Sequence, residues 1–140
     1  MSEGQNVQIV RDCYASFGRG DIQTILNNLS DDVEWILPGE GVLPQGGLYE
    51  GPEGVTRFFQ TLSETTEMLK FEPREFVAQG DRVVAFGSFK AKAKATGRSA
   101  EANWVMSFTF RDGKITNFRE YTDTAALAVA YVQEARSASA

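Results

Sequence analysis

The sequence contains no histidine and a single cysteine in its 140 residues. Without histidine, the chain cannot form a Ser-His-Asp or Cys-His catalytic group, a His-ligated metal site or an imidazole acid or base. The lone Cys13 has no disulfide partner in the chain, and we interpret it as a buried apolar filler. Any proton transfer near pH 7 must therefore be carried out by Asp, Glu, Tyr, Lys or water.

Positive charge and long apolar runs are also scarce. The net charge of −5 argues against a nucleic-acid partner, because phosphate binding depends on Lys and Arg. A basic cluster over residues 90–98 alternates with other residues and is typical of a solvated strand face. No apolar stretch approaches the roughly 20 residues of a membrane span, and the N-terminus lacks the pattern of a signal peptide. We therefore expect a cytoplasmic protein with no membrane partner.

Signals for metal ions and nucleotides are missing as well. With no histidine and one cysteine, only an all-carboxylate metal site remains, and no acidic cluster has suitable spacing for one. The glycines between Gly39 and Gly54 match neither nucleotide-binding fingerprint. The sequence therefore predicts neither a cofactor nor a metal.

The first half of the chain predicts three helices. Gly18 and Gly20 end the first helix, Asp21 caps the second, and Pro52 opens the third. A short strand over residues 33–37 and a loop over 38–51, rich in glycine and proline, separate the second and third helices. The apolar stripes of the three helices are Val7, Val10, Tyr14 and Phe17; Ile22, Ile25, Leu26 and Leu29; and Val55, Phe58, Phe59 and Leu62.

The second half predicts an antiparallel meander followed by a helix. Four long alternating segments cover residues 68–78, 82–95, 100–110 and 114–123, and hairpin turns separate them. Asp123 is interpreted as the cap of a last helix that starts near Thr124. The pattern is that of one α+β domain over residues 1–140, with N-terminal helices packed on a strongly curved, mixed, mostly antiparallel sheet. Residues 137–140 are expected to form a disordered tail.

Several short motifs, taken in order along the chain, resemble a known family. They are Tyr14, Gly20-Asp21, Asp32-Val33-Glu34-Trp35, the 38–44 loop, the segment 47–55 with Phe58-Phe59, Gly80-Asp81-Arg82-Val83-Val84 and the segment 113–123. Their order and spacing are similar to those of the SnoaL-like branch of the superfamily that includes nuclear transport factor two, ketosteroid isomerase, scytalone dehydratase and limonene epoxide hydrolase. The resemblance implies a cone-shaped fold with an internal apolar pocket and a homodimer formed through the outer sheet face. It implies no particular activity, because this fold hosts several enzyme classes and plain binding modules.

Glu120 is the main candidate for the chemistry. The resemblance to limonene epoxide hydrolases implies that the acid of the Arg-acid-Tyr segment, which is Glu120 here, faces the pocket. Among apolar neighbours such as Trp35 and Phe118 its pKa should rise toward neutrality, as an acid or base working at pH 7 requires. The alternative is a structural ion pair of Glu120 with Arg119, Arg111 or Lys90.

Tyr14 is the second catalytic candidate. The resemblance places it where ketosteroid isomerases carry an oxyanion-hole tyrosine; the alternative is a tyrosine of the core. The other isomerase and epoxide-hydrolase groups are replaced by apolar or unrelated residues, which argues against both activities. The expected substrate-binding residues are Trp35, Leu37, Phe59, Ser88, Lys90, Ala102, Trp104, Met106 and Phe118.

Two hypotheses follow for the function. The first is a cofactor-free isomerase, polyketide cyclase-like enzyme or dehydratase (a lyase) that acts on an apolar carbonyl-bearing or polycyclic compound, with Glu120 as acid and base. The second is a non-catalytic module that binds a small molecule or a protein partner. The first predicts that Glu120 points inward, is partly buried and lies within hydrogen-bond reach of a second polar group or water. The second predicts a salt-bridged or solvated Glu120 and a wholly apolar cavity.

Overall fold

The computed structural model describes residues 2–132. The elements in chain order are α1 (Glu3–Gly18), α2 (Ile22–Asn27), β1 (Leu29–Leu37), β2 (Gly47–Glu50), α3 (Gly51–Thr65), β3 (Thr66–Gln79), β4 (Arg82–Ala93), β5 (Ser99–Arg111), β6 (Lys114–Thr122) and α4 (Thr124–Tyr131). The predicted tail over residues 137–140 lies outside the described residues. Within the described part, no helix is long and apolar enough to cross a membrane.

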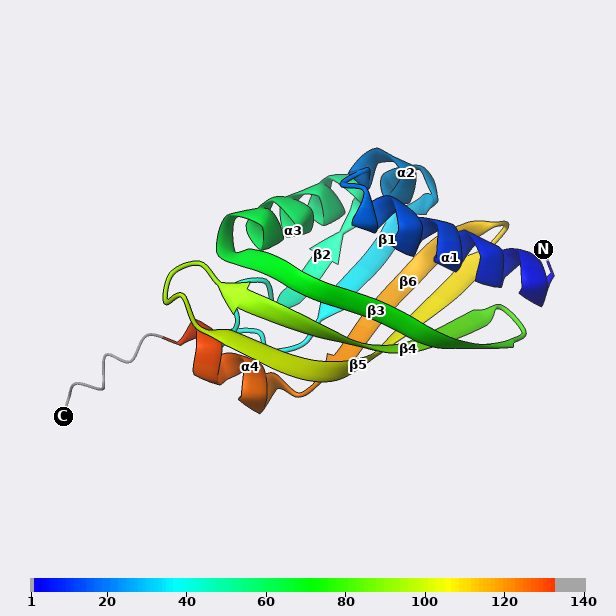
Figure 1. The fold of residues 1–140 in the computed structure, drawn as a ribbon. Coiled ribbons are helices and arrows are strands. Elements are labelled where there is room, and N and C mark those ends of the chain that lie inside the picture. Colours follow the sequence, from blue (N-terminus) through cyan, green and yellow to red (C-terminus); the bar gives the residue numbers. More distant parts are fainter. Residues whose placement is uncertain (1, 133–140) are drawn as a thin grey trace.

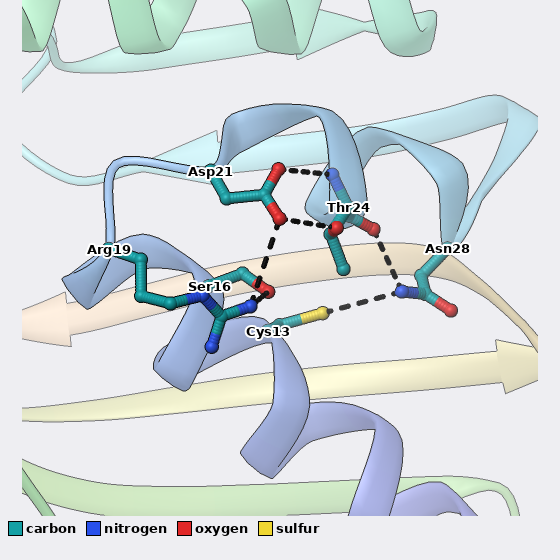
Figure 2. Close-up of polar contacts among 6 residues, drawn as sticks. All are labelled: Cys13, Ser16, Arg19, Asp21, Thr24 and Asn28. Atoms are coloured by element: carbon teal, nitrogen blue, oxygen red, sulfur yellow. Dashed lines mark hydrogen bonds and ion pairs between the residues drawn. The ribbon is translucent and has the colours of Figure 1, made fainter.

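The junction between α1 and α2 is held by side-chain contacts (Figure 2). As predicted, Asp21 caps α2: its carboxylate accepts hydrogen bonds from the Thr24 backbone N–H at 3.2 Å and from the Thr24 hydroxyl at 2.6 Å. Arg19 lies 3.7 Å from Asp21, and Asn28 donates to the Thr24 carbonyl oxygen at 2.9 Å. These contacts fix the turn that folds α2 back against α1.

The six strands form one open, mixed sheet with the order β2-β1-β6-β5-β4-β3. The long strands β3 to β6 pair as the predicted antiparallel meander, whereas β1 pairs with β6 in parallel. Figure 1 shows α1, α2 and α3 together on one side of the curved sheet, and α4 at one end of the long strands. The predicted α+β class, with helices over a bent and mostly antiparallel sheet, is confirmed.

The segment over residues 38–51, predicted to be a loop, contains one short strand. β2 pairs with the end of β1, placing Tyr49 opposite Trp35. β1 itself begins at Leu29, four residues before the predicted start. Pairing between strands explains both the presence of β2 and the early start of β1. β1 has a partner strand on each edge, β6 and β2, and the glycine-rich turn brings β2 back alongside β1.

Gly87 in β4 makes room for a large side chain on the inner face of the sheet. It lies opposite Trp104 of β5, whose indole ring stacks on Phe71 at a centroid distance of 5.1 Å. A Cβ atom on Gly87 would lie 2.3 Å from both the Trp104 ring and the carbonyl oxygen of Glu72. The absence of a side chain at this position is therefore what allows Trp104 to lie flat in the core.

We expect Gly87→Ala to lower the free energy of unfolding by about 3 kcal/mol, because the backbone oxygen and the buried ring cannot both move away. Thermal unfolding followed by circular dichroism measures this as a drop in Tm of about 10 °C. Gly18→Ala is the matched control, because a Cβ atom at that position meets nothing within 4 Å. Equal melting temperatures for the two variants would contradict the predicted role of Gly87.

The β4–β5 turn holds the C-terminal end of α4. Thr96 donates to the Ala130 carbonyl oxygen at 2.6 Å, and Arg98 donates to the carbonyl oxygens of Val129 and Val132 at 3.0 and 2.7 Å. At the other end of the helix, Asp123 accepts from the Ala126 N–H, which confirms the predicted cap. Both ends of α4 are thus fixed, and its inner residues close one end of the space under the sheet.

Candidate functional site

A cavity of about 100 Å³ lies between the inner face of the sheet and the helices. Each described helix and strand except β2 contributes to its lining. The wall is mainly aromatic and aliphatic. It includes the pair Trp35 and Phe118, whose rings stack at a centroid distance of 4.0 Å. The volume suffices for several water molecules or for a small organic group.

Glu120 brings a carboxyl group into this apolar space from β6. No hydrogen bond or ion pair joins it to another group in the described part of the chain, and Arg111 pairs instead with Asp32 at 2.8 Å. Lys90 and Arg119 form no ion pair with it either. Because burial penalises the charged form, the pKa of Glu120 is raised to about 7, which confirms the expected direction. The alternative of a structural ion pair for Glu120 is therefore wrong.

Tyr14 projects from α1 into the same cavity. Its hydroxyl donates to the Met106 sulfur at 3.1 Å, and its ring packs among Phe71, Phe76, Trp104 and Phe108. Burial, and secondarily the charge of Glu120, raise the pKa of Tyr14 well above its ordinary value. The phenol is therefore a neutral donor in the same cavity as Glu120, and it donates to a weak acceptor, the Met106 sulfur, rather than to the acid.

Apart from Ser88 and Lys90, the other predicted site residues fall into two groups. Trp35, Leu37, Phe59, Met106 and Phe118 line the cavity together with Glu120 and Tyr14. Ala102 and Trp104 lie on the inner face but not on the cavity wall; Trp104 is buried behind Tyr14 and Phe71.

Ser88 and Lys90 require a correction, because they do not line the cavity. They alternate with Gly87, Phe89 and Ala91, which are buried on the inner side of β4. Small and apolar residues take the inner positions of this strand, and the lysine ammonium stays in solvent. Both residues therefore lie on the outer face of the sheet.

A polar corner of the cavity was not predicted from the sequence. Gln45 from the 38–46 loop, Thr66 at the start of β3 and Tyr131 from α4 all line the cavity, and the Tyr131 hydroxyl is hydrogen-bonded to Thr66. Gln45 lies in a segment without periodicity, which was predicted only as a loop. No sequence signal placed these three side chains together.

Cys13 also lines the cavity, and burial raises the pKa of its thiol to about 12. At neutral pH it is a protonated, apolar group, in agreement with its interpretation as a filler. Within residues 2–132, no three Cys, Asp or Glu side chains come together as a set of metal ligands.

The arrangement of helices over a bent, open sheet is that of the NTF2-like proteins. The sequence matches the SnoaL-like domain over residues 10–118, and the chain therefore belongs to the SnoaL-like family. An NTF2-like protein from Burkholderia xenovorans LB400 is 45% identical, with a TM-score of 0.84 over 93% of this chain and 98% of that chain.

Two further solved structures are similar. TerC, crystallised with polyporic acid, is 35% identical, with a TM-score of 0.81 over 90% of this chain and 97% of that chain. A protein from Mesorhizobium loti named as a SnoaL-like polyketide cyclase is 25% identical, with a TM-score of 0.70 over 82% of this chain and 97% of that chain.

Proposed function

We propose that this protein is a cofactor-free enzyme that moves a proton to or from the carbon next to a carbonyl group in a small apolar compound. One observation carries the proposal: the Glu120 carboxyl lies in an apolar cavity with neither an ion pair nor a hydrogen bond in the described part of the chain. A pKa of about 7 populates both its ionised and its protonated form near neutrality. Both forms are needed by a group that first accepts and then returns a proton.

The proposed step transfers one proton and no other atom. The Glu120 carboxylate takes the proton from the carbon and the C–H bond breaks. Its electron pair forms a C=C bond while the π pair of the carbonyl group moves to the oxygen, which gives an enolate. Tyr14 donates a hydrogen bond to that oxygen in place of its weak bond to the Met106 sulfur. Return of the proton to another carbon of a conjugated enolate gives isomerisation. Attack of the enolate carbon on a second carbonyl group of the compound forms a C–C bond and gives cyclisation, with the Glu120 proton passing to the new alkoxide. Loss of a hydroxyl group from the β carbon, which takes up the Glu120 proton and leaves as water, gives dehydration.

The comparisons support a small-molecule ligand for this site. TerC has been crystallised with polyporic acid, and the Mesorhizobium loti relative is named as a polyketide cyclase. These observations describe the relatives, and they agree with an aromatic cavity that holds one acid in this chain.

The proposal is tested with 1-tetralone, an apolar bicyclic ketone with exchangeable hydrogens at C2. In D₂O, proton NMR should show that the wild-type protein accelerates the loss of the C2 signal over buffer alone. Exchange occurs because the protonated Glu120 trades its proton with solvent before returning a deuteron to the carbon. Binding of the ketone without accelerated exchange would overturn the proposed enzymatic activity and favour a non-catalytic binding protein.

A homodimer through the outer sheet face is also proposed. Phe86, Val105 and Tyr121 lie directly opposite one another across β4, β5 and β6, and Tyr121 is 53% exposed. An apolar row of this kind can be buried against a second copy of itself. We expect light scattering to show a dimer for the wild type and a monomer for Tyr121→Glu. Val129→Glu on the exposed side of α4 is the control and should stay dimeric; a monomeric wild type would refute the dimer.

A further inference from the structure

The Gln45 side chain carries a buried polar atom with no partner. Gln45 lies in the 38–46 loop, is 9% exposed and lines the cavity. Its Oε1 atom has no hydrogen-bond partner in the described structure. A buried acceptor without a donor is costly, so this atom is positioned for a donor that arrives with a ligand.

A chain of hydroxyl groups in this corner of the cavity offers no proton to Gln45 Oε1. Thr65 donates its only hydroxyl proton to the Thr61 carbonyl oxygen at 2.7 Å, so at its contact with Thr66 it is the acceptor. Thr66 then accepts from Tyr131. Burial raises the pKa of the Tyr131 phenol, so it keeps its proton at neutral pH. Because that proton is donated to Thr66, Tyr131 has none left for Gln45 Oε1, which stays without a donor.

The loop holds Gln45 in place. The Tyr49 hydroxyl donates to the Gln45 backbone oxygen at 2.8 Å, and the Leu43 N–H donates to the Gly39 oxygen at 2.7 Å. A Cβ atom on Gly46 would lie only 2.5 Å from the Gly39 carbonyl carbon, which shows how tightly the loop folds on itself. Gln45 therefore cannot easily move to satisfy its oxygen elsewhere, and the acceptor is preorganised.

Trp35 supplies the complementary group, a donor. Its indole Nε1–H is buried without a partner, and the stack with Phe118 fixes the plane of the ring on the cavity wall. Trp104 also has an unpartnered Nε1–H, but it does not line the cavity. One unpartnered donor and one unpartnered acceptor thus belong to residues that line the same aromatic cavity.

We propose that this cavity recognises a small flat ketone that also carries a hydroxyl group, with the hydroxyl donating to Gln45 Oε1 and a ligand oxygen accepting from Trp35 Nε1–H. This assignment rests on the proposed function, for which it names the substrate class. The aromatic wall supplies affinity for the flat carbon skeleton, while Gln45 and Trp35 select its polar substituents.

The test uses 1-tetralone, its 5-, 6- and 7-hydroxy derivatives and their methyl ethers, with affinities measured by calorimetry. We expect at least one hydroxytetralone to bind about tenfold more tightly than its methyl ether, because the ether cannot donate to Gln45. Gln45→Met keeps the length of the side chain and should abolish that difference. Gln60→Met, on the exposed side of α3, should retain it. Trp35→Phe should weaken binding of 1-tetralone relative to the hydrocarbon tetralin, which has no acceptor.

The outcomes separate this assignment from the proposed function. Accelerated C2 exchange with equal affinities for the hydroxyl and ether compounds would overturn the roles of Gln45 and Trp35 and leave Glu120 as the acid and base. Selective binding of a hydroxytetralone without accelerated exchange would support the roles of Gln45 and Trp35 in ligand recognition and overturn the proposed enzymatic activity. Absence of binding by all members of the series would overturn the ligand class. The comparison of ligands on the wild type decides the question even if Gln45→Met fails to fold.

Discussion

Glu120→Gln is expected to slow C2 exchange of 1-tetralone at least about a hundredfold, because the amide can neither accept nor return the proton. The affinity for the ketone should change by less than about threefold, since the amide has nearly the shape of the carboxyl group. Proton NMR in D₂O at a pD near 8 measures the exchange, and calorimetry measures the affinity.

Two further variants define the effect. Glu101→Gln makes the same chemical change at an exposed position of β5 and should keep full activity. Glu120→Asp keeps the acid but shortens the side chain, and we expect a rate between those of the wild type and Glu120→Gln. If exchange persists undiminished in Glu120→Gln, the proton is moved by another group and the proposed function fails.

The second large effect is a dependence of stability on pH that Glu120 alone should produce. Its pKa is about 7 in the folded protein, against 4.5 for an ordinary carboxyl of this type. The folded state therefore binds the proton of Glu120 more tightly than the unfolded state does. The stability that this tighter binding adds to the folded protein is fully present below pH 4.5. This stability is lost as the pH rises toward 7, and above pH 7 the free energy of unfolding is lower by about 3 kcal/mol.

Glu120→Gln removes this titration and isolates it. We expect the variant to be more stable than the wild type by about 3 kcal/mol at pH 8.5 and equally stable near pH 4.5. Tyr14 and Tyr131, whose pKa values Glu120 helps to raise, stay neutral over this range and add no titration of their own. Denaturation with urea at several pH values measures the difference. A difference that does not vary with pH would show that Glu120 is ordinarily solvated in the folded protein.

Much of the fold could be predicted from local patterns. The end of α1 follows from Gly20, which adopts a positive φ of 75°, and the start of α2 follows from capping by Asp21. The hairpins follow from turn residues between alternating segments. β2 could not be predicted in this way, because its four residues form a strand only by pairing with β1. Short edge strands depend on their partner rather than on their own sequence.

The candidate site divides in the same manner. Glu120 and Phe118 were placed inward by simple alternation along β6 together with the family resemblance, and both line the cavity. Ser88 and Lys90 were expected to point inward on the wrong alternation of their strand, and a shift of one residue in a strand moves a side chain to the opposite face. The alternation of alanine with lysine in β4 indicates the correct face.

The sequence by itself determined the class of chemistry: a chain without histidine, with one cysteine and with one acid on an apolar strand face, leaves proton transfer to a carboxylate. Only the tertiary structure decided how that acid is surrounded and which polar groups share its cavity. Gln45, Thr66 and Tyr131 come from a loop, a strand and a helix that are far apart in the chain. Their meeting depends on how these elements pack together, and no local pattern encodes that packing.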